Sequence, residues 1–277
     1  MASLAEGHRF QAVRNTGSPE ELELLGYSIG RTWARPAAAM PDAWSGDSPG
    51  PPAADPEPLP EPARSWIDGA RRFAYGEHAG DAGGHDPFHV ERVWHMARRL
   101  AGTSPLADRV VVELAALLHD VDDWKRAPPA DGVAGGRTGR WLSGAGVPEA
   151  LSRQVLETIA QVSFLGVGQP RPVTPEAHVV QDADRLDALG AVGIARLFAF
   201  GGSRGRPLHD PGIPPAPGED AAAARGRRST SLNHIYEKIL HLRDLLNTDP
   251  ARCLGAGRHR FVEEFLARFL DEWEGRR

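Results

Sequence analysis

The chain has 277 residues, of which 41% are hydrophobic and 25% are charged, proportions that are ordinary for a globular protein. The net charge of −5 excludes a strongly basic chain and argues against nucleic acid as the main partner. The single cysteine, Cys253, excludes an intramolecular disulfide and a cysteine-based zinc site. Because the chain contains neither a membrane-length apolar run nor a signal-peptide core, we expect a soluble cytoplasmic protein with no membrane partner.

The N-terminal part of the chain is predicted to be an extension rather than a domain. Residues 36–62 are dense in Pro, Ala, Asp and Gly, so they cannot bury enough apolar surface to offset the entropy of ordering. A periodic stretch at 20–29 is compatible with one helix, which is too small for a domain. We therefore expect residues 1–64 to be a mostly disordered, low-complexity extension, either regulatory or non-native, and residues 65–277 to form one helical domain.

Helix signals dominate the chain after this extension. A first helix is expected over 65–75. A capping residue followed by proline then marks three helix starts. These are Asp86-Pro87, for a helix ending near Leu100, Ser104-Pro105, for an apolar helix ending at His119-Asp120, and Thr174-Pro175, for the helix with Asp184.

Four more helices are expected, at 148–164, 191–200, 231–247 and 250–273. No segment alternates in the manner of a strand, so the predicted fold class is all-α. Residues 201–228 are rich in Gly, Pro and Arg and are predicted to form a long loop. The arginines in this loop either attract a polyphosphate or are solvated surface charges.

The pair His119-Asp120 is the most informative feature of the sequence, because an apolar helix leads directly into it. Aspartate is seldom fully buried without a partner, and a metal ion would satisfy an imidazole and a carboxylate together. An ordinary capped helix end is the alternative. Two other His-Asp dipeptides are set aside, since Asp86 is explained as an N-cap and His209-Asp210 lies in the predicted loop.

Two further residues are suitable partners for this pair. His89 is expected in the first turn of its helix, on one face with Arg92, where an imidazole and a guanidinium can serve a metal and a phosphate together. Asp184 lies among apolar residues, which suggests an inward carboxylate that needs a cation. The alternatives are a satisfied histidine, a solvated Arg92, and an exposed Asp184 beside an Arg185 that pairs elsewhere. The order of these residues on successive helices favours a metal site.

Three short segments together form one pattern: His89-x-x-Arg92-Val93, Leu118-His119-Asp120 and Ala183-Asp184-Arg185-Leu186. This pattern resembles the HD superfamily of metal-dependent phosphohydrolases. Further segments are similar to bacterial HD-domain hydrolases, namely Ala115 to Asp120, Gln181 to Ala188, Ala195 to Gly202 and Ser231 to Lys238. The resemblance extends roughly from Trp66 to Trp273 and implies a helical bundle that binds a divalent metal through His89, His119, Asp120 and Asp184.

One divalent ion is expected at this site. Binuclear branches of the superfamily add histidines between the His-Asp pair and the last Asp, but here that interval contains only His178, on another helix face from Asp184. Two imidazoles and two carboxylates suit Mn²⁺ or Mg²⁺. The absence of a Gly-Tyr-Pro signature near the site argues against the cyclic-dinucleotide phosphodiesterase branch.

The resemblance also implies a reaction, the hydrolysis of a phosphoric ester or anhydride by metal-activated water. Asp123 is the candidate general base or orienting group, with helix-end solvation as its alternative. Arg92, Lys125 and Arg185 are candidate phosphate clamps.

Candidate residues of the substrate pocket lie at the start of the predicted 231–247 helix and are Asn233, His234 and Lys238, together with Arg185. Capping and surface placement are the alternatives for the first three. The related hydrolases suggest a nucleotide or another small phosphorylated metabolite as the substrate. The competing class is a catalytically inactive HD-fold module that senses a nucleotide or holds a partner, although the complete ligand set argues against it. The oligomeric state is not predicted.

Overall fold

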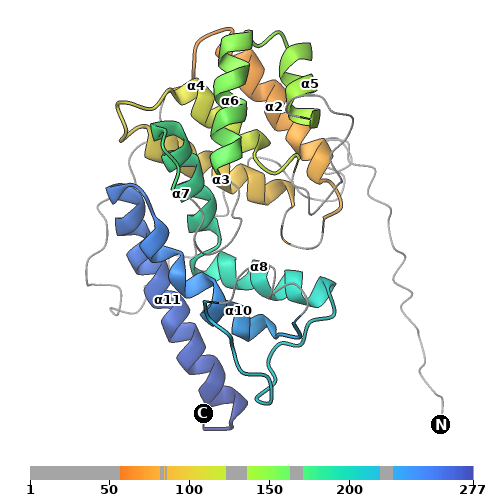
Figure 1. Ribbon diagram of the computed structural model, residues 1–277, viewed down its shortest axis with the longest axis vertical. Coiled ribbons are helices and arrows are strands. Elements are labelled where there is room, and N and C mark those ends of the chain that lie inside the picture. The colour runs from red at the N-terminus through yellow and green to blue at the C-terminus, as the bar shows by residue number, and fades with distance from the viewer. Residues whose placement is uncertain are drawn as a thin grey trace, which may run out of the picture. The chain divides into compact units, whose positions relative to one another are not determined.

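All regular elements in the described part of the chain are helices, which confirms the all-α prediction (Figure 1). The computed structural model describes residues 57–81, 84, 86–122, 136–162, 171–218 and 227–276. Most of the predicted N-terminal extension lies outside these residues, and so do Asp123 and Lys125.

The fully described connections between helices are short, whereas the connection between α8 and α10, residues 204–230, is long and is described in part. In chain order they are α2 (Ala63–His78), α3 (Pro87–Ala101), α4 (Arg109–Leu118), α5 (Gly136–Gly144), α6 (Glu149–Val162), α7 (Pro175–Asp187), α8 (Gly190–Ser203), α10 (Ser231–Glu237), the 3₁₀ helices η2 (Ile239–His241) and η3 (Arg243–Leu245), and α11 (Asp249–Trp273).

Side-chain caps begin two helices where the sequence predicts them. Asp86 accepts a hydrogen bond from the backbone N–H of His89 at 2.8 Å, and Pro87 is the first residue of α3. Thr174 accepts one from the backbone N–H of Ala177 at 3.2 Å at the start of α7. These caps satisfy backbone donors that have no partner inside the helix.

The prediction that α4 begins at Ser104-Pro105 is wrong. A turn closed by a hydrogen bond from the Ala107 N–H to the Ser104 carbonyl precedes the helix. Asp108 is the cap, because its carboxylate accepts from the backbone N–H of Val110 at 2.8 Å and from that of Val111. An aspartate closer to the apolar run therefore replaces the Ser-Pro pair as the helix start.

One further prediction is wrong, and one helix was not predicted. The helix expected at 231–247 ends at Glu237, because Lys238 has φ −136° and ψ −54°, and the chain continues as η2 and η3. Helix α5 was not predicted, because its first N–H groups are capped from a distant segment: Asp122 accepts from the N–H groups of Arg137 at 3.0 Å and Thr138 at 2.9 Å. A cap from so far along the chain leaves no local sequence signature.

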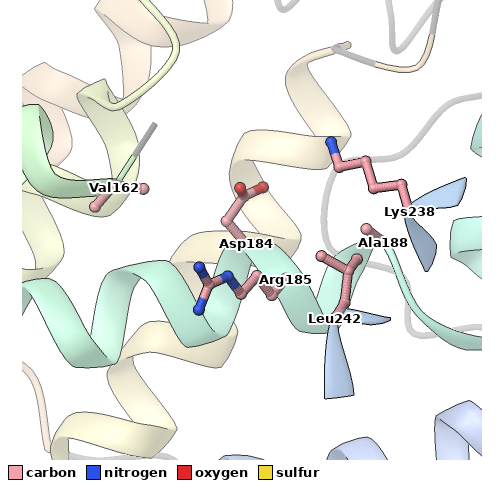
Figure 2. A pocket seen from close by; sticks show the side chains of 6 residues that line it. All are labelled: Val162, Asp184, Arg185, Ala188, Lys238 and Leu242. Carbon is pink, nitrogen blue, oxygen red and sulfur yellow. The ribbon is translucent and has the colours of Figure 1, made fainter. Parts of the chain in front are cut away.

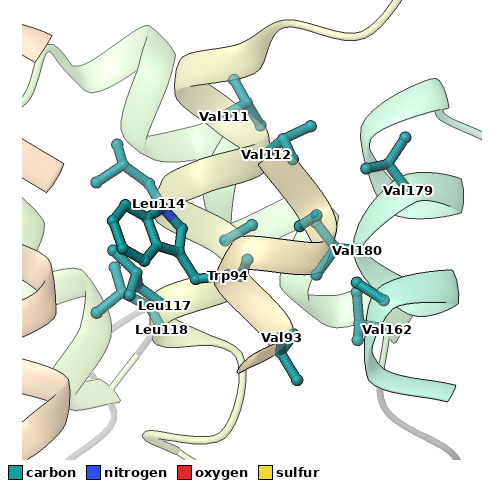
Figure 3. Packing of buried hydrophobic residues seen from close by; sticks show 14 of the residues in the cluster. Val93, Trp94, Val111, Val112, Leu114, Leu117, Leu118, Val162, Val179 and Val180 are labelled. Carbon is teal, nitrogen blue, oxygen red and sulfur yellow. The ribbon is translucent and has the colours of Figure 1, made fainter. Parts of the chain in front are cut away.

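Helix α4 is the centre of the larger hydrophobic core (Figure 3). All of its residues from Val111 to Leu118 are buried, so the helix is covered on every side. It packs against α2, α3, α6 and α7, and α3 also packs against α7. Figure 3 shows Val93 and Trp94 of α3 among the valines and leucines of this cluster. The end of α4 is therefore held by contacts with several helices.

A second, smaller cluster joins α8, α10 and η2 to the C-terminal half of α11. Its buried members are Leu189, Ile194, Leu232, Ile235, Ile239, Leu242, Val262 and Leu266. Helix α11 contacts both α7 and α8. Within the described residues, no individual helix combines the length and the apolarity needed to cross a bilayer, and α7 with α8 does so only as a pair bent by 72°.

Asp182 attaches the start of α11 to α7. Its carboxylate, on a fully buried residue, accepts hydrogen bonds from the backbone N–H groups of Asn247 at 2.7 Å and Thr248 at 2.8 Å. It also accepts from the side chains of the same two residues, at 3.0 Å and 2.8 Å. One buried acid thus satisfies the polar groups that precede α11.

We predict that Asp182→Ala lowers the free energy of unfolding by about 3 kcal/mol, because it leaves several buried donors without an acceptor. Chemical denaturation monitored by circular dichroism would measure this loss. Asp249→Ala is the matched control, since the Asp249 side chain is 93% exposed at the same helix end. Its effect is expected to stay within about 0.5 kcal/mol. Equal effects of the two substitutions would contradict the role of Asp182.

Candidate metal site

Side chains from three helices meet at the end of α4. One ligand atom each from His89, His119 and Asp184 lies within 4.8 Å of the others. Asp120 joins them, with a carboxylate oxygen 3.4 Å from Nε2 of His89 and the other 3.5 Å from Nε2 of His119. The structure therefore brings together the four residues that the sequence nominates as metal ligands.

The packing of the core sets the positions of these four residues. His119 follows the last residue of the buried helix α4, and Asp120 follows it in the turn. His89, which is fully buried, lies in the first turn of α3. Asp184 lies near the end of α7, and α7 packs against both α3 and α4. The site is consequently built on helices that contact one another directly.

The donor set at His119 fits a metal ion. Its Nδ1 lies 2.9 Å from the carbonyl oxygen of Ala116, which can only accept, so Nδ1 carries the proton. The lone pair is then on Nε2, which is buried and has no hydrogen-bond partner among the described residues. A buried imidazole nitrogen without a partner, next to carboxylates, is suited to a cation.

His89 lies between carboxylates on both edges of its ring. Nδ1 is 2.8 Å from Oδ2 of Asp187, and Nε2 is 3.6 Å from Oδ1 of Asp184. Burial by itself lowers the pKa of His89, but the hydrogen bonds with Asp120 and Asp187 outweigh it and raise the pKa to about 9. The carboxylates that hold a proton on this ring would equally stabilise a divalent cation, so proton and metal compete for the site.

Asp187 connects the cluster to two arginines. Arg92 donates from Nε to Oδ1 at 2.7 Å and from Nη2 to Oδ2 at 3.1 Å, and Arg196 donates from Nη1 to Oδ2 at 2.7 Å. Burial alone would raise the pKa of Asp187, but the hydrogen bonds from His89 and Arg92 hold it well below its usual range. The carboxylate therefore stays ionised beside His89.

A small pocket opens next to Asp184 (Figure 2). It is lined by Val162, Asp184, Arg185, Ala188, Lys238 and Leu242. In Figure 2 the side chains of Asp184 and Lys238 reach toward the same side of this pocket. Arg185 donates from its guanidinium to the carbonyl oxygen of Leu245, and burial lowers its pKa. Two predicted substrate-binding residues, Arg185 and Lys238, thus lie beside a predicted metal ligand.

The other predicted substrate-binding residues are placed differently. Asn233 donates from Nδ2 to the carbonyl oxygen of Ile213 at 2.7 Å and lines a separate cavity of about 310 Å³. His234 is one residue further along α10, and burial, with Lys238 and Arg206 nearby, lowers its pKa to about 4. Neither residue lines the pocket beside Asp184. The imidazole of His234 is therefore neutral at physiological pH.

The predicted catalytic residues are only partly described. Arg92 has a guanidinium bound to Asp187 and a side chain that is 35% exposed. Asp123 and Lys125 lie outside the described residues. The preceding Asp122 caps α5, while Arg137 of α5 donates to the carbonyl oxygen of Val121 and to Glu77 of α2. The turn that carries Asp120 is thereby fastened to two helices.

Sequence reasoning did not assign a role to Asp187 or Arg196. A signal for Asp187 was present, because it follows Asp184 by three positions on a helix and therefore shares its face. A metal-binding imidazole also requires an acceptor for its second nitrogen. For Arg196, which also donates to the carbonyl oxygen of Gly84 at 2.7 Å, the sequence contains no comparable signal.

Comparison with known proteins agrees with this geometry. A family model described as the HD domain matches residues 88–189, which include all four candidate ligands. The protein YpgQ of Bacillus subtilis is 36% identical over 188 residues, which are 67% of this chain and 83% of that protein.

Solved structures of similar proteins share the fold. A Lactobacillus plantarum protein is 34% identical with a TM-score of 0.67, and the match covers 76% of this chain and 97% of that one. An HD-superfamily hydrolase of Bacillus thuringiensis is 39% identical with a TM-score of 0.59, over 77% and 99% of the chains. B. subtilis YpgQ in complex with ADP is 31% identical with a TM-score of 0.56, over 74% and 96%.

We predict that His234 titrates near pH 4 in the folded protein, well below the ordinary histidine value of 6.5. Because the unfolded chain binds this proton more readily, stability should fall as the pH decreases from about 6.5 to about 4. NMR of the imidazole Hε1 proton against pH would measure the pKa. His234→Gln should reduce the acid-side loss of stability, and titration of His234 near 6.5 would contradict the prediction.

Proposed function

The chain belongs to the HD-domain superfamily, and we propose that it is a divalent-metal-dependent phosphohydrolase that acts on a nucleotide or another small phosphorylated metabolite. The observation that carries this proposal is the convergence of His89, His119 and Asp184, whose ligand atoms lie within 4.8 Å of one another. A second support is the match to an HD-superfamily hydrolase of B. thuringiensis over 99% of that chain.

In this proposal, His89, His119, Asp120 and Asp184 hold one divalent ion. Two imidazoles and two carboxylates suit Mn²⁺ or Mg²⁺. When bound, such an ion acidifies a water molecule and polarises a phosphoryl oxygen. The chain contributes the geometry: His119 presents Nε2 because its Nδ1 proton is held by the Ala116 carbonyl. Asp184, with a side chain 33% exposed, is the acid nearest to solvent in this set.

The pocket beside Asp184 supports a phosphorylated substrate. Lys238 adds a positive charge to its wall, opposite to the charge of a phosphate group. Val162 and Leu242 add apolar surface suited to the uncharged part of a metabolite. The structure of YpgQ in complex with ADP supports a nucleotide as the substrate class, since that protein is similar to this chain.

The remaining predicted roles are part of the same proposal. Asp123 would act as the general base or orient the attacking water, and Lys125 would offset charge in the transition state. Both follow the His-Asp turn in the sequence. Arg92, which is bound to Asp187, would contribute positive charge near the site, and Arg185 would contribute positive charge from the pocket wall. Asn233 and His234 would act on the substrate only from outside this pocket.

We predict that purified protein hydrolyses one or more members of a panel of nucleoside mono-, di- and triphosphates in the presence of Mn²⁺. His119→Ala and Asp184→Ala should each lower kcat/KM by at least about 100-fold, because each removes a ligand of the ion that activates water. Release of inorganic phosphate or pyrophosphate, with metal content measured on the same samples, would test this.

His178→Ala is the control for this experiment. His178 lies on α7 six residues before Asp184, which places it on another face of the helix, and its Nε2 is 2.8 Å from the carbonyl oxygen of Pro172. Its activity should match that of the wild type within about threefold. Equal activity in the wild type, His119→Ala and Asp184→Ala would refute the metal site. Binding of Mn²⁺ and nucleotide without any hydrolysis would instead favour a sensing module.

A separate prediction concerns Lys238. Lys238→Gln should lower kcat/KM for the phosphorylated substrate by about 10- to 100-fold, because it removes a positive charge from the pocket wall. Mn²⁺ affinity should stay within about threefold of the wild type, because Lys238 is not a ligand. Steady-state kinetics and calorimetric titration with Mn²⁺ would separate the two effects. Unchanged kinetics would remove Lys238 from the substrate site.

A further inference from the structure

We propose that Asp187 is a positioning residue for the metal site, which acts through His89 and is itself oriented by Arg92 and Arg196. This inference rests on the metal site of the proposed function. It concerns a residue outside the four ligands, and it assigns the two arginines to the orientation of Asp187.

The contact between His89 and Asp187 determines which ring nitrogen faces the metal site. Nδ1 lies 2.8 Å from Oδ2 of Asp187, and an ionised carboxylate only accepts hydrogen bonds. Nδ1 therefore carries a proton in this contact, and Nε2 is the nitrogen directed at the ligand cluster, 3.4 Å from Asp120. A metal-binding histidine needs this arrangement, with an acceptor at the nitrogen that does not bind the ion.

The carboxylate of Asp187 is itself held from two directions. Arg92 contacts both of its oxygens, from Nε at 2.7 Å and from Nη2 at 3.1 Å, in the paired geometry that restricts rotation of a carboxylate. Arg196 adds a third contact, from Nη1 to Oδ2 at 2.7 Å. The Asp187 side chain is only 6% exposed, so water screens these contacts little. His89 thus faces an acceptor that is fixed in position.

Arg196 also links this contact to the rest of the fold. It belongs to α8, and its Nε donates to the carbonyl oxygen of Gly84 at 2.7 Å. Gly84 has φ +90°, and a Cβ at this position would lie 3.3 Å from Cβ of Arg196. The segment before α3 therefore packs closely against α8, and one guanidinium joins both to the end of α7.

Removal of the Asp187 carboxylate has a definite chemical consequence. In Asp187→Ala, the N–H groups of Arg92 and Arg196 that met Oδ2 lose their acceptor next to Nδ1 of His89. They would then donate to Nδ1, which must become unprotonated, and a neutral ring would carry its proton on Nε2. That form cannot bind a metal through Nε2. In Asp187→Asn, the amide oxygen keeps the Oδ2 position, where donors converge, but the negative charge is lost.

The test compares wild type, Asp187→Asn, Asp187→Ala and Asp182→Asn. Asp182 is the matched control, since it is a buried acid on the same helix whose hydrogen bonds go to Asn247 and Thr248. Calorimetric titration with Mn²⁺ should show binding about 10- to 100-fold weaker in Asp187→Ala and about tenfold weaker in Asp187→Asn. Asp182→Asn should bind Mn²⁺ as the wild type does, although it unfolds at lower denaturant concentration.

A spectroscopic readout distinguishes positioning from general damage. In protein loaded with Zn²⁺ as a diamagnetic probe, ¹⁵N-labelled His89 should show a slowly exchanging Nδ1 proton in the wild type and in Asp187→Asn. Asp187→Ala should lose this signal. If Asp187→Ala fails to fold, the weaker Mn²⁺ binding of Asp187→Asn relative to Asp182→Asn decides the question.

Three results would overturn the inference. These are Mn²⁺ binding by both Asp187 variants as tight as in the wild type, equal weakening in Asp182→Asn, and an Nδ1 proton that still exchanges slowly in folded Asp187→Ala. Each leaves a hydrolytic, metal-binding wild type intact, so the proposed function would stand. A wild type that binds neither Mn²⁺ nor Zn²⁺ would refute the proposed function itself and the inference with it.

Discussion

Helix α4 is the constraint on which the rest of the site depends. The orientation of α4 is fixed, because the helix is buried from Val111 to Leu118 and neighbouring helices pack against every side of it. His119 and Asp120 follow directly after its last residue, so their side chains lie beside those of His89 and Asp184. The packing of apolar side chains thereby determines where an imidazole and a carboxylate are placed, and α3 and α7 bring His89 and Asp184 to the same point.

The charges around this point are arranged in two layers. Asp120 and Asp184 face the imidazoles on the inner side, where a divalent cation would offset them. On the other side of His89, Asp187 is balanced by the guanidinium groups of Arg92 and Arg196. The inner layer is suited to bind an ion, whereas the outer layer is already neutralised by the protein. This difference explains why we assign Asp187 as a positioning residue for His89 and not as a metal ligand.

The pocket beside Asp184 combines elements from both hydrophobic clusters. Val162 and Asp184 come from helices around α4, while Lys238 and Leu242 come from the α10 region that packs with α8 and α11. The buried hydrogen bonds of Asp182 connect α7 to the start of α11, so they help to hold the two clusters together. The position of the pocket relative to the candidate metal site therefore depends partly on the hydrogen bonds of Asp182, a residue that belongs to neither.

The sequence by itself determined the all-α class and most helix positions, and its resemblance to the HD superfamily nominated His89, His119, Asp120 and Asp184 as ligands. The helices could be predicted because N-caps and apolar periodicity are local signals, whereas the ligand set was implied by the resemblance of short motifs to a known family. Three errors mark the limits of such signals. The start of α4 was placed too early because the nearer cap, Asp108, was overlooked. The helix expected at 231–247 is broken after Glu237, and α5 was not predicted because its cap comes from the remote Asp122. Only the tertiary structure placed Asn233 in a different cavity from Lys238. It alone joined Asp187 to His89, Arg92 and Arg196, since the first two of these contacts connect residues 98 and 95 positions apart and are created by packing.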